Sequence, residues 1–393
     1  MFVKEESGAP SGCLRGSMRV LFAGGGTAGH INPALAIAGY LREKEPDTAI
    51  VYVGNKGGME ERLVPAAGFE FRTVHISGFQ RKLTLKNIQR NLQTLGRIVT
   101  SSQEAKKIIR DFKPDICVGT GGYVSGPVIR EAMKLGIPAV IHEQNAYPGV
   151  TNKMLAKKAS RVMLAVADAQ RHFEADARCI LTGNPVRQEL ARADKEDSRR
   201  KLGLDARPLI LSFGGSLGAR SINEAVADML VRSARTGKYQ HIHGYGQYAK
   251  WMPQLIAEKG LDLKEHPCIQ LREYINNMPE CMAAADLVIC RAGAITLSEL
   301  QAQGKASILI PSPNVAENHQ YHNAMALVRR NAAVLIEEKD LTGELLWNRV
   351  EEIFARPGGA AELGENAAKM AIPDACERIV KVMHEVLKES RKA

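Results

Sequence analysis

The stretch Val20-Leu21-Phe22-Ala23-Gly24-Gly25-Gly26-Thr27-Ala28-Gly29-His30 passes from an apolar strand directly into a glycine-rich turn and the start of a helix. A second stretch has the same order, because Ile210-Leu211-Ser212-Phe213 is followed by Gly214-Gly215-Ser216-Leu217-Gly218-Ala219. Around both stretches, short β-branched apolar runs alternate with amphipathic helical segments, which is typical of doubly wound parallel α/β sheets. The sequence therefore predicts two similar α/β domains.

Each half of the chain is expected to contain six strands. In the first half they are Val20–Ala23, Ile50–Val53, Phe71–Val74, Ile116–Gly119, Ala139–His142 and Val162–Ala165. In the second half they are Leu209–Phe213, Gln240–His243, Ile269–Leu271, Leu287–Cys290, Ser307–Ile310 and Val334–Ile336. We expect domains at 18–186 and 187–372, a helix at 373–390 that packs back on the first domain, and a disordered leader at 1–17 without the apolar core of a secretion signal.

The composition excludes several classes of protein. With 393 residues, 45% of them hydrophobic and 24% charged, the chain matches an ordinary globular protein. No apolar run approaches the roughly 18–20 residues that span a bilayer. The seven cysteines are scattered and include no C-x-x-C pair, which argues against a disulfide framework or a zinc ribbon and indicates a reducing cytoplasm.

The net charge of +10 is concentrated in the first half of the chain. Between Arg72 and Lys113 there are ten basic residues and two acidic ones, which points to an anionic partner. Phe79 and Phe112 are the only aromatic residues of this segment, too few for the base-stacking platform of a nucleic-acid site. We therefore expect an anionic phospholipid surface as partner, and no nucleic acid.

The first glycine turn satisfies the dinucleotide-binding pattern Gly24-x-Gly26-x-x-Gly29. That pattern also needs an acidic residue at the end of the second strand to hold a ribose, and here the strand ends Val53-Gly54-Asn55-Lys56. A dehydrogenase is thus disfavoured. Two interpretations remain: a loop whose glycines let a polar substrate approach the backbone beside His30, or a tight strand-to-helix turn and nothing more.

Two further turns of this kind suit a phosphate-rich ligand. The backbone N–H groups of 214–219 and the positive end of the next helix can bind a diphosphate, and a third turn at Arg291–Thr296 repeats the arrangement. Glu299 lies one turn into the third helix. Its carboxylate either accepts hydrogen bonds from both hydroxyls of a ribose or only favours the helix N-terminus, and the residues alone leave these two interpretations even.

Three more polar clusters follow predicted strands, at the sheet edge where α/β proteins bind ligands. They are Gly121–Pro127, His142–Asn145 and Glu317–Asn323. Their hydroxyl, amide and imidazole groups suit the recognition of sugar hydroxyls, although loop capping explains any single cluster. His241 and His243 lie on one face of a strand with no acidic or cysteine neighbour, so packing is favoured over a metal site. Since no Asp-x-Asp occurs either, we expect no metal and no other cofactor.

Together these motifs resemble the MurG family, the bacterial glycosyltransferases that add N-acetylglucosamine from UDP-N-acetylglucosamine (UDP-GlcNAc) to the lipid-linked muramyl pentapeptide lipid I, making lipid II for peptidoglycan. The resemblance runs from about Met18 to the C-terminal helix. It is carried by the segments Gly24–His30, Gly121–Pro127, His142–Asn145, Gly183–Arg187, Gly214–Ala219 and Arg291–Glu299. It implies a GT-B fold, in which two Rossmann-like domains face each other across a cleft, with lipid I on the first domain and UDP-GlcNAc mainly on the second.

The resemblance also implies a set of donor-binding residues. For the nucleotide they are Glu299 at the ribose, Ile275 and Arg187 at the uracil, and Ser216, Ala294, Ile295 and Thr296 at the diphosphate. For the sugar they are Asn145, Gln320 and Asn323, and Thr27 is a further donor-binding residue. Some members of the family have two adjacent glutamines where this chain has His319-Gln320, so the contact to the sugar 4-hydroxyl falls on either His319 or Gln320.

The reaction implied by the resemblance is a displacement at the anomeric carbon. The acceptor's 4-hydroxyl attacks, UDP leaves, and the α-linked donor becomes a β-linked product. His30 is the candidate base, since an imidazole titrates near neutrality and this one follows the glycine loop. The residues expected at the acceptor pyrophosphate are Gly24, Gly25, Gly26, Tyr123 and Ser125.

A membrane contact is expected before and within a predicted helix over 84–110. The apolar positions of this helix recur at helical spacing and are expected mainly to pack against the sheet. The residues assigned to the membrane are Phe79, Arg81, Lys82, Leu83, Lys86 and Arg90, and a solvated basic helix is the alternative. This assignment predicts a peripheral protein on the cytoplasmic face of the bacterial inner membrane.

Three other functions remain open from the sequence. Another lipid glycosyltransferase of the same fold would share the donor half of the site. A UDP-GlcNAc 2-epimerase would use the donor without an acceptor, and a sensor would bind UDP-GlcNAc without turnover. Release of UDP together with a disaccharide lipid would distinguish a transferase from the last two.

Overall fold

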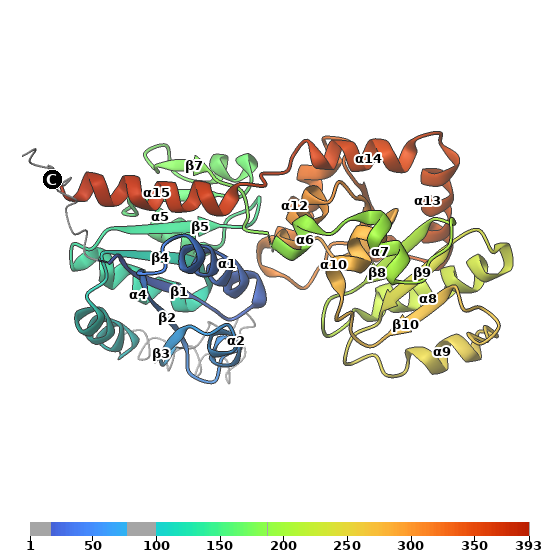
Figure 1. The fold of residues 1–393 in the computed structure, drawn as a ribbon, viewed down its shortest axis with the longest axis horizontal. Helices are drawn as coiled ribbons and strands as arrows, with labels where there is room; N and C mark the ends of the chain where they lie inside the picture. Colours follow the sequence, from blue (N-terminus) through green and yellow to red (C-terminus); the bar gives the residue numbers. More distant parts are fainter. Residues whose placement is uncertain (1–16, 77–99, 187, 393) are drawn as a thin grey trace, which may run out of the picture.

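The computed structural model describes residues 17–76, 100–186 and 188–392. Within them the chain forms two sheets, one in each half, each flanked by helices (Figure 1). The first sheet is parallel throughout, in the order β3-β2-β1-β4-β5-β6-β7. Its strands are β1 (Arg19–Gly24), β2 (Ala49–Asn55), β3 (Glu70–Val74), β4 (Ile116–Gly121), β5 (Ala139–Glu143), β6 (Arg161–Leu164) and β7 (Cys179–Leu181).

Helices cover both faces of the first sheet. Along β1, Val20 and Phe22 point to one apolar cluster, whereas Leu21 and Ala23 point to the other, and all four are fully buried. Because both faces are covered, the strand is a continuous apolar run rather than an alternating one. The helices are α1 (Ala28–Lys44), α2 (Glu60–Ala66), a helical stretch at 100–112, α4 (Gly122–Lys134), α5 (Val150–Ala156) and the short 3₁₀ segment η1 (Ala167–His172).

The second sheet is also parallel, in the order β10-β9-β8-β11-β12-β13. Its strands are β8 (Leu209–Phe213), β9 (Gln240–Gly244), β10 (Ile269–Arg272), β11 (Leu287–Cys290), β12 (Ala306–Leu309) and β13 (Val334–Leu335). Its helices are α6 (Gln188–Arg192), α7 (Lys195–Lys201), α8 (Arg220–Thr236), α9 (Met252–Glu258), α10 (Met278–Ala284), α11 (Ala294–Ala302), η2 (Ala316–Asn318), α12 (His319–Val328), η3 (Glu338–Asp340), α13 (Gly343–Ala355) and α14 (Gly359–Ala368).

The twelve predicted strands are all present, with ends shifted by no more than two residues. Strand β7 was missed. It is a three-residue edge strand whose Ile180 and Leu181 are 36% and 41% exposed, so no buried apolar run marks it in the sequence. The segment is a strand because its backbone pairs with β6 at the edge of the sheet.

The C-terminal helix α15 (Ala375–Ser390) lies on the first domain, although the chain reaches it from the second (Figure 1). Its apolar side, including Ile379 and Met383, joins the core cluster of α1 and β1. Two ion pairs flank this contact. Arg161 Nη2 lies 2.6 Å from Glu389 Oε1, and His384 Nε2 lies 2.7 Å from Glu45 Oε1. The first domain is thus built from both ends of the described chain.

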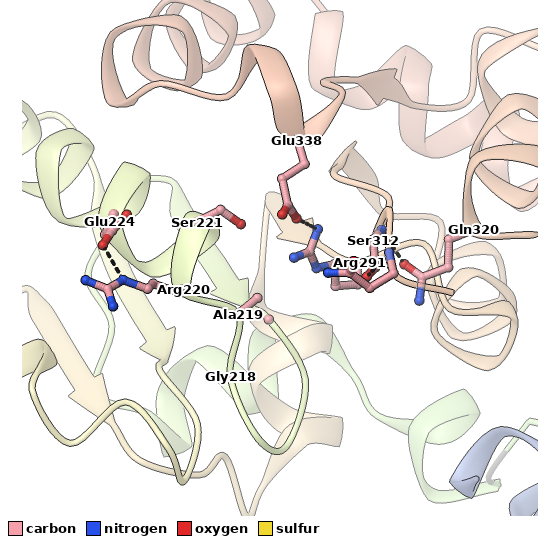
Figure 2. A pocket seen from close by; sticks show the side chains of 11 residues that line it. Gly218, Ala219, Arg220, Ser221, Glu224, Arg291, Ser312, Gln320 and Glu338 are labelled. Carbon is pink, nitrogen blue, oxygen red and sulfur yellow. Dashed lines mark hydrogen bonds and ion pairs between the residues drawn. The ribbon is translucent and has the colours of Figure 1, made fainter. Parts of the chain in front are cut away.

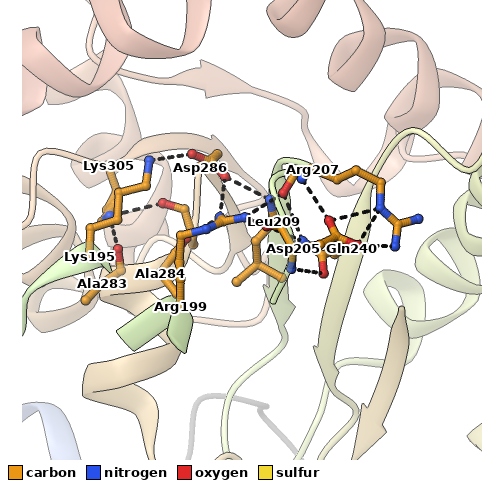
Figure 3. A network of polar contacts seen from close by, with 11 residues as sticks. Lys195, Arg199, Asp205, Arg207, Leu209, Gln240, Ala283, Ala284, Asp286 and Lys305 are labelled. Atoms are coloured by element: carbon orange, nitrogen blue, oxygen red, sulfur yellow. Dashed lines mark hydrogen bonds and ion pairs between the residues drawn. The ribbon is translucent and has the colours of Figure 1, made fainter. Parts of the chain in front are cut away.

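A polar network ties the amino edge of the second sheet together (Figure 3). Asp286, directly before β11, accepts hydrogen bonds from the Leu209 N–H at 2.8 Å and from Arg199 Nη1 at 3.1 Å, and it pairs with Lys195 Nζ at 2.5 Å. Lys305 Nζ donates to the Ala283 carbonyl at 2.6 Å, and burial lowers the pKa of this ammonium to about 8. The network anchors α7 to β8 and β11 at the edge opposite the ligand-binding loops.

The two histidines of β9 pack in the core, as predicted. His241 Nε2 lies 2.7 Å from Ser233 Oγ on α8, and His243 Nδ1 lies 2.8 Å from Ser212 Oγ on β8. Burial lowers the pKa of His241 to about 3 and that of His243 to about 4. Both rings are therefore neutral hydrogen-bonding groups at pH 7.

Candidate active site

The carboxyl ends of the two sheets border a cavity of about 880 Å³. Its walls come from the loops after β1, β4 and β5 of the first domain, and from α11 and the segment around the start of α12 of the second. The predicted site residues that line it are Thr27, His30, Tyr123, Asn145, Ala294, Ile295, Thr296, Glu299, His319 and Gln320. Residues from both halves of the chain therefore meet in one place, at the edge where parallel sheets bind ligands.

His30 lies in the first turn of α1, and the backbone of two glycine turns encloses its ring. Its Nδ1 lies 3.3 Å from the Gly25 carbonyl oxygen and 3.1 Å from Thr27 Oγ1. Gly121, at the end of β4, has a φ of +100°, and a Cβ there would lie 2.8 Å from the His30 Cδ2. Because only glycine combines this φ with so close an approach, the turn after β4 is shaped around the imidazole.

The surroundings of His30 fix its protonation state. Burial lowers the pKa of His30 to about 4 against the opposing hydrogen bond to Gly25, and the nearby His319 lowers it further. The ring is therefore neutral at pH 7. Since the Gly25 carbonyl can only accept, we assign the proton to Nδ1 and the free lone pair to Nε2, which is the form that a general base requires.

Glu143, at the end of β5, organises the loop that carries Asn145. One carboxylate oxygen accepts hydrogen bonds from the N–H and Nδ2 of Asn145, both at 3.0 Å, and the other accepts from the Gly149 N–H at 3.1 Å and Asn152 Nδ2 at 2.8 Å. Burial raises the pKa of this carboxyl, and these hydrogen bonds oppose the rise. Glu143 was not among the predicted site residues, although its place at the end of a predicted strand could have signalled it.

Asn323 joins the two domains. It is 3% exposed, its Oδ1 accepts from the Ala146 N–H at 2.8 Å, and its Nδ2 donates to Asn145 Oδ1 at 3.1 Å and to the Ala292 carbonyl at 3.2 Å. Both polar atoms are thus used within the protein. A direct contact between Asn323 and the sugar, as predicted, would require these hydrogen bonds to break, whereas Asn145 already lines the cavity.

The first turn of α11 and Glu299 form part of the cavity wall on the second domain, where the donor is predicted to bind. The N–H groups of Ala294, Ile295 and Thr296 belong to this first turn, where the helix offers them no carbonyl partner. Glu299 lies about one turn further on and is 6% exposed. Asn184, from the segment that joins the domains, donates to Ser298 Oγ at 3.0 Å and thereby holds α11. Asn184 was not predicted as a site residue, although its motif was noted.

The segment leading into α12 carries strained backbone. Glu317 and Asn318 have φ values of +52° and +47°, a region that costs a non-glycine residue about 1–3 kcal/mol. Directly after them, His319 Nδ1 lies 2.8 Å from the Ala316 carbonyl oxygen, and Gln320 Oε1 accepts from the Ser312 N–H at 2.8 Å. The strain therefore occurs where these two predicted sugar-binding residues enter the cavity.

A second cavity, of about 600 Å³, shares Gln320 with the first (Figure 2). The second glycine loop and the N-terminus of α8 form one side of it. On another side, Arg291 pairs with Glu338 and donates to the carbonyls of Ile310 and Pro311, both at 3.1 Å. The positive charge of Arg291 is therefore compensated within the protein, and the helix N-terminus is left as the group facing an anion.

Among the described predicted residues that do not line the main cavity are Ser125, Ile275 and Ser216. Ser125 is fully buried, and its hydroxyl faces the backbone of Gly119 in β4 rather than the cavity. Ile275 is 5% exposed and packs against Gly244. Ser216 lies on an exposed loop, where its carbonyl accepts from the Gln247 N–H at 3.1 Å. Contact with the acceptor pyrophosphate through the Ser125 hydroxyl would require that side chain to turn.

Hydrogen bonds with two side chains of the first domain, Tyr52 and Glu60, hold the backbone of the first glycine loop. The Gly24 carbonyl accepts from the Tyr52 hydroxyl at 3.1 Å, and the Gly26 N–H donates to Glu60 Oε2 at 3.4 Å. The Gly26 N–H is thus directed inward in this structure, away from the place expected for a pyrophosphate. The remaining predicted residues lie outside the described part of the chain: Arg187, Phe79, Arg81, Lys82, Leu83, Lys86 and Arg90.

The described residues contain neither a cluster of metal ligands nor a helix that could span a membrane. At 17–76, 100–186 and 188–392, no group of three or more His, Cys, Asp or Glu side chains is placed to hold a metal ion. In the same residues, no helix has the length and apolarity needed to cross a bilayer.

Comparison with known proteins identifies the family. Residues 20–164 match the glycosyltransferase family 28 N-terminal domain, and residues 209–379 match its C-terminal domain. The chain is 43% identical to the UDP-N-acetylglucosamine--N-acetylmuramyl-(pentapeptide) pyrophosphoryl-undecaprenol N-acetylglucosamine transferase of Acetivibrio thermocellus, over 94% of this chain and 99% of that protein. The enzyme of the same name from Bacillus cytotoxicus is 40% identical, over 95% of this chain and 100% of that protein. This chain belongs to that family, the MurG family. It is accordingly a UDP-sugar-dependent glycosyltransferase.

Solved structures agree with this placement. MurG from Acinetobacter baumannii superposes with a TM-score of 0.75 at 29% identity, covering 94% of this chain and 99% of that one. A UDP-GlcNAc 2-epimerase from Neisseria meningitidis has a TM-score of 0.64 at 13% identity, which reflects the fold alone. The predicted GT-B fold of the MurG family is confirmed.

The position of Glu299 generates a test of the donor side. A hydrogen bond to a charged group contributes roughly 1.5–3 kcal/mol, so Glu299→Ala is expected to raise the KM for the donor by about ten-fold or more. The measurement is the initial rate against UDP-GlcNAc concentration. Glu344→Ala, which removes an exposed carboxylate on α13, is the control. A donor KM that is the same in both variants and the parent would remove Glu299 from the site.

Proposed function

We propose that this glycosyltransferase moves N-acetylglucosamine from UDP-GlcNAc to the 4-hydroxyl of the muramyl sugar of lipid I, inverting the anomeric carbon and producing lipid II. The observation that carries the proposal is the shared cavity of about 880 Å³, which brings His30 of the first domain together with Glu299 and the N-terminus of α11 of the second. The names of the relatives support it, since they specify N-acetylglucosamine transfer to an N-acetylmuramyl-pentapeptide on pyrophosphoryl-undecaprenol.

His30 acts as the general base in this proposal. Its Nε2 accepts the proton of the acceptor hydroxyl while the oxygen forms a bond to the anomeric carbon. The bond from that carbon to the diphosphate breaks at the same time, and UDP leaves with the electron pair. With a pKa of about 4, His30 is a weak base, so the proton moves only as the attacking oxygen becomes acidic during bond formation.

Helix N-termini stabilise the leaving group in this proposal. The charge that develops on UDP is met by the N–H groups that open α11 and by the second glycine loop before α8. Glu299 holds the ribose. Asn145, fixed by Glu143, and the pair His319-Gln320 read the sugar, beside Thr27. The other donor contacts proposed are Arg187, Ser216 and the Ile275 backbone.

The acceptor and the membrane belong to the first domain in this proposal. Tyr123 and the first glycine loop hold the acceptor pyrophosphate. The basic segment between Arg72 and Lys113 meets anionic phospholipid, so that the protein works peripherally on the cytoplasmic face of the bacterial inner membrane. By supplying lipid II, the enzyme would serve cell-wall growth, cell shape and division, and nucleic acid has no part in it.

The first experiment combines UDP-GlcNAc with a short-chain lipid I analogue. We expect UDP and a disaccharide lipid to appear in equal amounts, because each transfer releases one UDP. Omitting the acceptor is the control, and it should stop UDP release. If UDP-N-acetylmannosamine formed without an acceptor, the protein would be an epimerase, and binding without any product would make it a sensor.

His30→Ala is expected to lower kcat by at least ~10²-fold, because the general base acts in the transition state. The Kd for UDP, measured by calorimetry, should stay unchanged, since the proposed UDP contacts lie on the other domain. His384→Ala, which removes an exposed imidazole on α15, is the control. A large loss of UDP affinity in His30→Ala would instead make His30 a donor ligand.

The pH profile of the parent enzyme tests the same assignment. Because the pKa of His30 is lowered to about 4, the base is unprotonated throughout the neutral range and gains a proton only as the pH falls toward 4. We therefore expect kcat to be level between about pH 8 and pH 6. An acid limb centred near 6.5 that is missing in the His30→Ala variant would contradict the buried, neutral imidazole.

The membrane proposal is tested by charge reversal. Each basic residue near an anionic leaflet contributes ~1 kcal/mol, so replacing Arg81, Lys82, Lys86 and Arg90 with Glu should abolish cosedimentation with anionic liposomes at low salt and leave UDP binding intact. The control reverses four exposed basic residues of the second domain, namely Arg232, Arg235, Lys250 and Lys264. Unchanged cosedimentation of the first variant would place the membrane surface elsewhere.

A further inference from the structure

A buried carboxylate lies beneath the first glycine loop, outside the cavity and outside every role assigned above. Glu60 opens α2, and its side chain is fully buried. One carboxylate oxygen accepts from the Asn55 N–H at 2.8 Å, and the other accepts from the Gly26 N–H at 3.4 Å. Full burial of an acidic side chain is uncommon and calls for a specific set of partners.

The backbone around Glu60 is built to receive it. A Cβ on Gly25 would lie 2.3 Å from Glu60 Oε1, and a Cβ on Gly58 would lie 2.7 Å from the same atom. At Gly54, a Cβ would lie 2.4 Å from Glu60 Cγ. Three glycines from two loops and the end of β2 thus enclose this side chain, and any other residue at these positions would displace it.

The hydrogen bonds of Glu60 and His30 meet on one peptide group. The Gly25 carbonyl and the Gly26 N–H belong to the same planar trans unit, so they point in opposite directions. Glu60 accepts from the N–H side of this unit, and His30 Nδ1 lies 3.3 Å from its carbonyl side. The carboxylate and the imidazole therefore sit at the two ends of a single rigid group.

We propose that Glu60 is a positioning residue, which fixes the orientation and tautomer of His30 through the Gly25–Gly26 peptide. The inference rests on the proposed role of His30 as general base. A negative charge at the N–H end polarises the peptide and strengthens its carbonyl as an acceptor. That acceptor keeps the proton on Nδ1 and leaves Nε2 directed at the acceptor hydroxyl. Glu60 itself touches no substrate, since it does not line the cavity.

The test is Glu60→Gln, which keeps the shape and removes the charge and one of the two acceptors. Loss of the outer partners that orient a metal-ligating histidine typically costs about 10–100-fold, and we expect a decrease of similar size in kcat when His30 loses its orienting partner. The KM for UDP-GlcNAc and the Kd for UDP should not change, because the contacts of Glu60 are to the glycine loop and the end of β2 and not to the residues proposed to bind the donor. Glu61→Gln is the matched control, because Glu61 is an exposed neighbour on the same helix that accepts from the Gly57 N–H at 2.7 Å.

A second measurement reports the tautomer of His30 directly. Nitrogen NMR of the ¹⁵N-histidine-labelled parent, with His30 assigned by its loss in His30→Ala, should show the Nδ1-protonated tautomer. In Glu60→Gln the Nε2-protonated tautomer should gain population. An Nε2-protonated His30 in the parent would overturn the proposal, and so would a folded Glu60→Gln protein with the parent's kcat.

The two hypotheses fail in different ways. If His30→Ala keeps its kcat, then His30 is not the base and the proposed mechanism fails, whatever the tautomer. If His30→Ala is impaired while Glu60→Gln resembles the parent in kcat and tautomer, then the base assignment stands and only the positioning role of Glu60 is wrong.

Discussion

Within each sheet every strand runs parallel to its neighbours, and the rest of the molecule depends on this constraint. Parallel strands end at one edge of their sheet. The loops after β1, β4 and β5 therefore lie at the carboxyl edge of the first sheet, and the loop after β11 lies at the carboxyl edge of the second. These loops supply the walls of the main cavity. The opposite edge of the second sheet carries the Asp286 network instead, which anchors α7 to β8 and β11 (Figure 3).

Polar side chains join the two halves of the cavity, beside an apolar cluster in which Ala146 of the first domain packs with residues of the second. Asn323 of the second domain bonds to Asn145 and Ala146 of the first, and Asn184 reaches α11. The side-chain amides of Asn323 and Asn184 each hydrogen bond to residues of both domains. The geometry of the predicted sugar-binding side therefore depends on how the domains meet. The return of α15 to the first domain adds a second covalent link between them.

Features that depend on neighbouring residues could be predicted from the sequence. A strand followed by three glycines and a histidine is a local pattern, and so is the strand, glycine and helix order at 287–299 that places Glu299. Glu143, Asn323 and Glu60 could not be placed in this way. Asn323 bonds to residues of the other domain, Glu60 bonds to the loop after β1, and the partners of Glu143 lie on the loop after its own strand, which carries no regular pattern, and at the start of α5. The acid that opens α2 also has the same sequence signature as any acid in the first turn of a helix. The edge strand β7 exists only through its pairing with β6.

The distribution of charge explains how one cavity can serve both steps of a displacement. In the proposed mechanism, the reactive group on the acceptor side is the neutral imidazole of His30, which burial keeps uncharged and which lies beside a backbone carbonyl. On the donor side the groups facing the diphosphate are helix N-termini, while Arg291 is compensated by Glu338. Negative charge that develops during the reaction is therefore stabilised at the leaving diphosphate, and the positive charge appears only when His30 receives its proton. A base that was already protonated would be unable to accept that proton, so in the proposed mechanism the low pKa of His30 keeps its imidazole free to act.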